Sequence, residues 1–292
     1  MARGRRTGRA DGSADGAELG LGGLGGTSSR EASGAPLDTR RYLALSKTPT
    51  YGVLAALPLL LLYDVLIAFV NRGQRVSVRN GAEVLLGRAL AAVGAPTALG
   101  LTAVLAVLGV LFVVREQRRA PVPLDRRVFG RMAAESAVLA ILIGPVVRTA
   151  TSIVLAPLPG PSLAIPTIGF PPLAMTAQPS NGPLAQIALS LGAGLYEELV
   201  FRVILVTAIA WAVRASGKTS ARGALAVAVV TGAVLFSAAH YRPFNPAGET
   251  LLLTSFAYRF MAGLAFSALF AVRGFGVTAW THALYDVWVV LR

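Results

Sequence analysis

The stretch "GLYEELVFRVIL", residues 194–205, places two glutamates and an arginine inside an otherwise apolar run. A charged side chain at the centre of a membrane helix costs about 2.5–3.5 kcal/mol on insertion scales. Charges in such positions are therefore either paired with one another or used in function. What surrounds this stretch determines which of the two applies.

The composition of the 292-residue chain is that of a membrane protein. Hydrophobic residues make up 54% and charged residues 14%, and the mean hydropathy is +0.63. A soluble domain carries about 25% charged residues. Together with several apolar runs of about 20 residues, this composition predicts an all-α fold, a multi-pass transmembrane helical bundle.

The net charge of +13 does not indicate nucleic-acid binding, because the arginines gather in the N-terminal tail and in short loops between apolar runs. That distribution is typical of the positive-inside rule and makes the lipid bilayer the expected partner. Residues 115–131 and 214–222 are strongly basic and are expected in the cytoplasm. Residues 158–182 contain no Lys or Arg and are expected outside.

We expect three parts along the chain. Residues 1–45 are rich in Gly, Ala, Ser and Arg and are expected to form a disordered, basic cytoplasmic tail. Residues 46–182 hold the N-terminal membrane helices, and residues 183–292 hold a C-terminal set. The apolar segments are 49–71, 97–115, 129–157, 184–213, 222–240, 250–272 and 275–291. A shorter segment at 81–95 is either interfacial or re-entrant or a further crossing, so about seven to eight membrane helices are predicted.

The spacing of the three charges gives them unequal tasks. Glu198 and Arg202 are four residues apart, glutamate first, which is the favoured order for an ion pair on one helix face. Glu197 points about 100° away around the helix, toward another neighbour. A structural ion pair of Glu198 and Arg202 is therefore expected. The alternative is a single polar staple of all three residues against neighbouring helices.

The chain contains no cysteine, so disulfides and a thiol nucleophile are excluded. Its two histidines both lie downstream of the glutamate pair. His240 ends the segment "FSAAH" (236–240), and His282 precedes Asp286 by four residues, on one face of the last helix. Two imidazoles in polar contexts on later apolar helices favour a functional site over an isolated structural pair.

These residues resemble the CPBP family of intramembrane proteases, which includes CAAX prenyl endopeptidases and bacteriocin-immunity proteins. The resemblance consists of Glu-Glu-x-x-x-Arg at 197–202, Phe-x-x-x-His at 236–240 and His-x-x-x-Asp at 282–286. The three motifs occur in order on three apolar helices, within roughly residues 183–291. Residues 183–292 would accordingly form a CPBP-like catalytic membrane core.

The resemblance implies hydrolysis of a peptide bond by an activated water. Glu197 would be the general base, His240 would share the water, and His282 with Asp286 would stabilise the oxyanion. Glu198 and Arg202 would be structural. Because an ionised aspartate repels an oxyanion, Asp286 is either protonated or accepts a hydrogen bond from His282 and fixes its tautomer.

The resemblance leaves the metal open. Glu197, His240 and His282 form a legitimate zinc ligand set with an open position for water. The contiguous His-Glu-x-x-His signature of zinc proteases is missing. We therefore expect a glutamate-type mechanism without cofactor, with a zinc metallopeptidase as the alternative.

An intramembrane endopeptidase acting on a membrane-associated substrate, including a lipidated, CAAX-like one, is the favoured function. The alternatives are a proton or ion transporter that uses the same polar cluster, and a non-enzymatic immunity or scaffold factor. No internal repeat or pair of broken helices is evident, which counts against transport. The abundance of Ala, Arg and Gly suggests a GC-rich bacterial source and therefore the inner (plasma) membrane.

Overall fold

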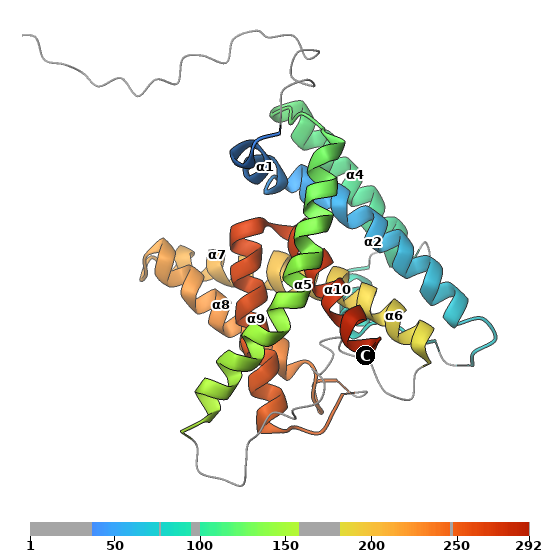
Figure 1. Ribbon diagram of the computed structural model, residues 1–292, viewed down its shortest axis with the longest axis vertical. Helices are drawn as coiled ribbons and strands as arrows, with labels where there is room; N and C mark the ends of the chain where they lie inside the picture. The colour runs from blue at the N-terminus through green and yellow to red at the C-terminus, as the bar shows by residue number, and fades with distance from the viewer. Residues whose placement is uncertain (1–36, 76, 95–99, 158–181, 246–247, 292) are drawn as a thin grey trace, which may run out of the picture. The chain divides into compact units, whose positions relative to one another are not determined.

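The computed structural model describes residues 37–75, 77–94, 100–157, 182–245 and 248–291. Helices are the regular secondary structure of these ranges (Figure 1), beside an isolated bridge between Tyr241 and Glu249. The predicted all-α class is confirmed. The helices of the N-terminal half are α1 (Thr39–Ser46), α2 (Pro49–Val70), α3 (Gly81–Ala92), α4 (Leu101–Arg119) and α5 (Arg126–Leu155). The C-terminal half contains α6 (Pro183–Gly192), the π-helical segments η2 (Ala193–Glu197) and η3 (Leu199–Val206), α7 (Thr207–Ala215), α8 (Ala221–Ala238), α9 (Leu253–Arg273) and α10 (Phe275–Val290).

Four of the described helices, α2, α5, α8 and α9, are long and apolar enough to cross a membrane. The expected count of seven to eight is not confirmed, for reasons that are visible in the other helices. α10 has 16 residues, and the helical run from 183 to 215 is divided by the two π-helical segments. α4 ends in "REQRR" and so carries its charges within the last turns. α3, with 12 residues, is about 18 Å long and is shorter than the ~30 Å hydrocarbon core.

α10 lies at the centre of the described fold, packed against α2, α5, α6 and α9 (Figure 1). α8 packs between α7 and α9. Glycine permits the tightest contact: a Cβ at Gly194 would lie 2.4 Å from the carbonyl oxygen of Ala279 in α10. Small residues of this kind let membrane helices approach closely. The segment that carries the two glutamates is thereby held directly against α10.

The predicted tail ends earlier than residue 45. α1 begins at Thr39, and Tyr42 within it is buried against α5. The Tyr42 hydroxyl donates to Glu135, which also forms an ion pair with Arg273. Burial and the neighbouring Glu135 carboxylate raise the pKa of Tyr42 to about 12, so it stays a neutral donor. The rest of the predicted tail (1–36) and most of the predicted external loop (158–181) lie outside the described residues.

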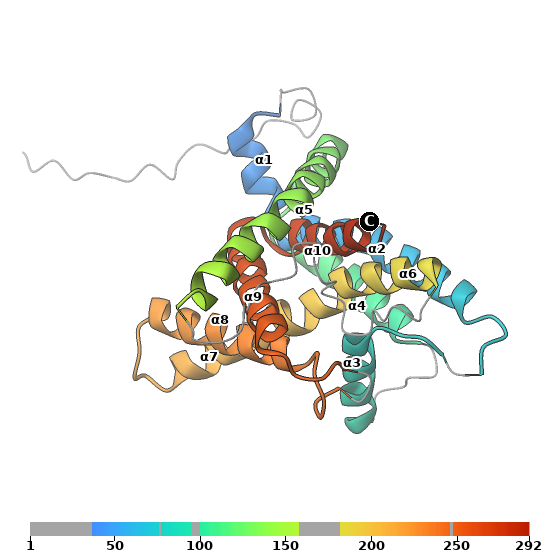
Figure 2. The same cartoon turned by 60° about the horizontal axis from the view of Figure 1, so that its bottom comes forward.

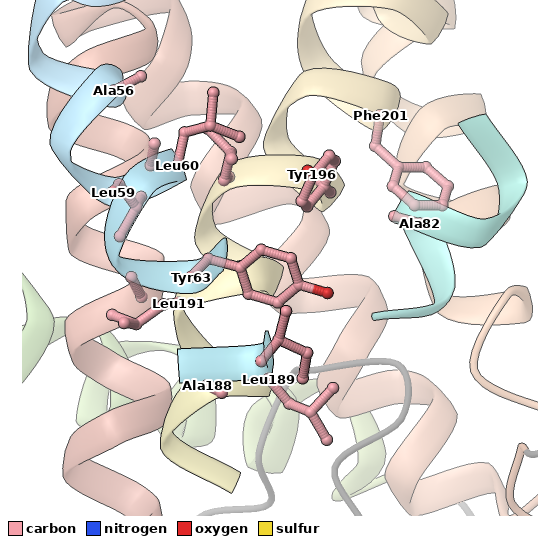
Figure 3. Packing of buried hydrophobic residues seen from close by; sticks show 14 of the residues in the cluster. Ala56, Leu59, Leu60, Tyr63, Ala82, Ala188, Leu189, Leu191, Tyr196 and Phe201 are labelled. Atoms are coloured by element: carbon pink, nitrogen blue, oxygen red, sulfur yellow. The ribbon is translucent and has the colours of Figure 1, made fainter. Parts of the chain in front are cut away.

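Tyr63 links the N-terminal helices to the segment of the two glutamates. Its ring projects from α2 and meets Tyr196 edge to face, with centroids 5.4 Å apart (Figure 3). Leu189 and Ala188 of α6 complete the same buried cluster. Ala82 of α3 belongs to this cluster as well, and α3 contacts η2 (Figure 2). The aromatic pair therefore joins α2 to the glutamate-bearing segment.

Candidate active site

Glu197 and Glu198 lie where two π-helical segments meet, Glu197 as the last residue of η2 and Glu198 between η2 and η3. π-helical turns are rare and occur frequently at functional sites. Both side chains are fully buried. Their carboxylates diverge, as the predicted angle between adjacent helix positions requires: Glu198 faces Arg202 and His282, whereas Glu197 faces Asn80 and His240.

The Glu198 carboxylate joins the ion pair to the last helix. Its Oε1 lies 3.1 Å from Arg202 Nη1 and 2.7 Å from His282 Nδ1. Because an ionised carboxylate only accepts hydrogen bonds, His282 donates from Nδ1. The guanidinium of Arg202 also lies 4.3 Å above the ring of Phe236, a cation–π contact. Glu198 is therefore more than the partner of Arg202, because it also orients His282.

The Glu197 carboxylate has different neighbours. Its Oε1 accepts a hydrogen bond of 3.1 Å from Asn80 Nδ2, and its Oε2 lies 3.9 Å from His240 Nε2. A separation of 3.9 Å is too long for a direct hydrogen bond, and a water about 2.8 Å from each atom would fit it. The other ring nitrogen, Nδ1 of His240, lies 2.8 Å from the carbonyl oxygen of Phe236. Since a carbonyl only accepts, Nδ1 carries the proton and Nε2 faces Glu197.

A separate ion pair holds the loop that follows His240. Glu249 donates its backbone N–H to the His240 carbonyl, and its carboxylate lies 2.6 Å from Arg259 Nη2 in α9. Arg259 also donates to the Tyr241 hydroxyl. The pair thereby links α9 to the backbone of His240 and to Tyr241 after it.

His282 and Asp286 lie on one face of α10, with His282 Nε2 3.6 Å from Asp286 Oδ2. The His282 ring also stacks on Phe266, with centroids 4.6 Å apart. The distance to Asp286 exceeds that of a hydrogen bond. The acceptor that orients the ring is thus Glu198, whereas acceptance from His282 was one of the two roles expected of Asp286.

The described residues do not bring together the predicted zinc ligands. Among them, no three His, Asp or Glu side chains are placed to hold a metal ion. The Nδ1 atom of His282 is bonded to Glu198, so it is not open to a metal shared with Glu197 and His240. Since this donor set does not fit zinc, no metal enters the chemistry below.

Asn80 is the site residue that sequence motifs missed. It lies 117 positions before Glu197, directly before α3, and its side chain is fully buried. An asparagine followed three residues later by Glu83 is a signal for a helix start, and Asn80 does cap α3. Nothing in that local signal indicates the contact with Glu197.

The comparison with protein families agrees with the three motifs. Residues 179–288 match the family described as type II CAAX prenyl endopeptidase Rce1-like. The matched range contains Glu197, His240, His282 and Asp286, and it excludes Asn80. No match was found among curated proteins or among solved structures. The match confirms the resemblance to CAAX-type intramembrane proteases in this part of the chain.

Proposed function

We propose that the region matching the Rce1-like family, residues 179–288, is the catalytic core of an intramembrane endopeptidase of glutamate type. The observation that carries this proposal is the buried pair of Glu197 and His240, whose facing atoms lie 3.9 Å apart. In the proposed reaction one water lies between them, donating one hydrogen to each.

The reaction proceeds by addition and elimination. Glu197 takes a proton from the water while the water oxygen bonds to the carbonyl carbon of the scissile peptide. His282, doubly protonated, donates from Nδ1 to Glu198 and from Nε2 to the oxyanion. The protonated Glu197 then gives its proton to the leaving nitrogen as the C–N bond breaks. The products are a carboxylic acid and an amine, and Glu197 returns to its initial state.

Asp286 is best understood as a partner of His282 in this scheme. At 3.6 Å from His282 Nε2, its carboxylate balances the charge of the doubly protonated ring together with Glu198. Arg202 holds Glu198 in place from the opposite side. The Glu198, Arg202 and Asp286 side chains thus support His282, and none of them touches the attacking water.

An apolar cavity beside the site favours a substrate that carries a lipid chain. The cavity measures about 550 Å³ and lies among α2, α4, η2, η3 and the junction of α9 with α10. Its lining includes Val53, Leu60, Leu108, Leu195 and Leu199. Leu195 and Leu199 flank the two glutamates in sequence, so the cavity and the site share one helical segment. A prenyl or acyl chain has the shape and chemistry to fill it.

The test uses the whole chain reconstituted in vesicles with a fluorogenic prenylated peptide that ends in a Cys-aliphatic-aliphatic-X sequence. We expect the wild type to cleave it faster than the same peptide without the lipid, and Glu197→Gln to abolish cleavage. Glu116→Gln is the matched control, because Glu116 is a carboxylate of α4 that accepts from Thr50, outside the site. Unchanged cleavage by Glu197→Gln would refute the general base. No cleavage of either peptide by the wild type would favour the transporter or immunity alternatives.

A further inference from the structure

Asn80 belongs to neither the three motifs nor the region that matches the family, yet it touches the proposed general base. Its Nδ2 lies 3.1 Å from Glu197 Oε1, and both side chains are fully buried. A hydrogen bond to an ionised carboxylate is stronger than one between neutral groups. Within the described residues, this contact directly joins the N-terminal helices to the Glu197 carboxylate.

The orientation of the Asn80 amide is fixed on its other side. Its Oδ1 accepts from the backbone N–H of Ala82 at 2.8 Å and so caps α3. An amide oxygen accepts and an amide nitrogen donates, so this bond identifies the nitrogen as the group that faces Glu197. The backbone N–H of Asn80 in turn donates to the Tyr63 hydroxyl at 3.2 Å. The side chain therefore has little freedom to turn.

Tyr63 and Gly192 set the position of Asn80. The Tyr63 hydroxyl donates to Glu83 of α3 while it accepts from Asn80, so α2 and α3 are tied together at this point. A Cβ at Gly192 would lie 2.6 Å from Tyr63 Cε2 and 3.2 Å from Asn80 Cβ. Glycine at the end of α6 therefore leaves the space that both side chains occupy.

We propose that Asn80 is a positioning residue that holds Oε1 of Glu197 and thereby aims Oε2 at His240. The inference rests on the proposed function of Glu197. A carboxylate can rotate about its terminal bond, which would move Oε2 away from His240. With Oε1 held, Glu197 presents one oxygen to the attacking water in a fixed direction. Small misplacements of catalytic groups lower rates strongly, by as much as about 100-fold for 1 Å.

The deciding variant is Asn80→Ser, measured in the vesicle assay with the prenylated peptide. Serine is a good N-cap and retains the bond to Ala82, but it is too short to reach Glu197. We expect kcat to fall about 10- to 100-fold with KM unchanged. Asn80→Asp also retains the cap, but it places a second carboxylate against Glu197. We expect the kcat of Asn80→Asp to be at least as low as that of Asn80→Ser.

The control is Asn71→Ser. Asn71 bonds the backbone of Val78 in the same connection between α2 and α3, and neither of these two bonds involves a residue of the site. We expect a lower unfolding temperature and a kcat within about twofold of wild type, the size typical of substitutions away from the reacting groups. Wild-type kcat in Asn80→Ser, or equal losses in Asn80→Ser and Asn71→Ser, would overturn the proposal.

A second measurement does not depend on activity. Unfolding temperatures of Asn80→Ser, Glu197→Ala and the double variant form a thermodynamic cycle. Because the two side chains bond each other, the double variant should lower the unfolding temperature by less than the sum of the two single shifts. Additive shifts would show that Asn80 and Glu197 do not interact. This result stands apart from the general-base proposal, which cleavage by the wild type and by Glu197→Gln tests.

Discussion

Two buried arginines, Arg259 and Arg202, are held in contrasting ways. Each is about 1% exposed. Arg259 donates from both terminal nitrogens to Glu249 and from one of them to Tyr241 and Ser255. Arg202 lies 3.1 Å from Glu198, yet within the described residues neither terminal nitrogen makes a well-formed hydrogen bond. The faces of Phe236 and Phe266 contact it instead.

The contrast separates a structural cluster from a reactive one. The structural cluster consists of Arg259, Glu249, Tyr241 and Ser255; it forms nearly all of its possible hydrogen bonds and holds the segment after His240. The reactive cluster consists of Arg202, Glu198 and His282 together with the neighbouring Glu197 and His240. Around Arg202, Glu198 Oε2 and His282 Nε2 also lack hydrogen bonds to the described residues. Buried polar atoms without partners are rare and call for an explanation such as catalysis. Here the incompletely bonded atoms adjoin the groups to which we assign chemistry.

The largest expected effect of breaking the reactive cluster is at His240. His240→Ala removes the imidazole that faces Glu197 and should lower kcat about 100- to 10,000-fold, the range for loss of a positioned proton acceptor. Peptide cleavage in vesicles, quenched at a series of times, measures this kcat. Ser255→Ala, which removes the hydrogen bonds of Ser255 to Tyr241, Glu249 and Arg259, is the comparison and should keep kcat close to wild type. Equal losses in the two variants would erase the distinction between the clusters.

The arginines themselves should differ in stability. Arg202→Met leaves Glu198 as a buried charge and should lower the free energy of unfolding by about 3–5 kcal/mol. Arg259→Met leaves Glu249, whose side chain is 49% exposed and can be hydrated, so about 1–3 kcal/mol is expected. Unfolding in mixed micelles with increasing SDS gives both values. If Arg259→Met lost more unfolding free energy than Arg202→Met, stability would depend more on the Arg259–Glu249 pair than on the Arg202–Glu198 pair, contrary to our expectation.

Glycine substitutions test the packing that supports the reactive cluster. The added methyl group of Gly192→Ala should push Tyr63 and Asn80 away from α6. Because Asn80 then moves relative to Glu197, kcat should fall about tenfold. Gly87→Ala in α3 is the control, since an added Cβ there meets nothing within 4 Å. It should leave kcat unchanged, and it should stabilise α3 slightly. Normal activity of Gly192→Ala would mean that the cluster tolerates displacement of α2 and α3.

Filling the apolar cavity should have the smallest effect on chemistry. Val53→Trp, in the cavity lining, should raise KM for the prenylated peptide about five- to tenfold with little change in kcat, as loss of a hydrophobic contact does. Val65→Trp lies on the same helix at a position that is 68% exposed and outside the lining. It should leave KM unchanged. Equal KM in the two variants would place the lipid chain elsewhere.

Much of this arrangement follows from local sequence. The apolar runs predict the helices, and the spacing of Glu198 and Arg202 predicts both their contact and the divergence of Glu197. The three motifs identify the candidate site residues, because residues four positions apart lie on the same face of a helix. The helix boundaries differ from the expected ones by a few residues, and α1 replaces the end of the expected tail because Tyr42 finds Glu135 as a partner.

Other features depend on contacts between distant segments, and local patterns do not encode them. The meeting of Asn80 with Glu197 requires α3 to be placed by Tyr63 and Gly192. The choice of Glu198 over Asp286 as the partner of His282 depends on how α10 packs against η2. The π-helical segments change which side chains share a face, and no periodicity of the sequence identifies them in advance. For the same reason the number of membrane crossings did not follow from apolar length alone.

The two adjacent carboxylates, Glu197 and Glu198, have different tasks, and one paired measurement separates them. Single-turnover cleavage rates and unfolding free energies of Glu197→Gln and Glu198→Gln are compared in the same vesicles and micelles. We expect Glu197→Gln to lower the rate at least about 100-fold with a nearly unchanged free energy of unfolding. Glu198→Gln should lower that free energy by about 3–5 kcal/mol, because Arg202 loses its counter-charge. A wild-type cleavage rate in Glu197→Gln would contradict this division of tasks. A larger loss of unfolding free energy in Glu197→Gln than in Glu198→Gln would contradict it as well.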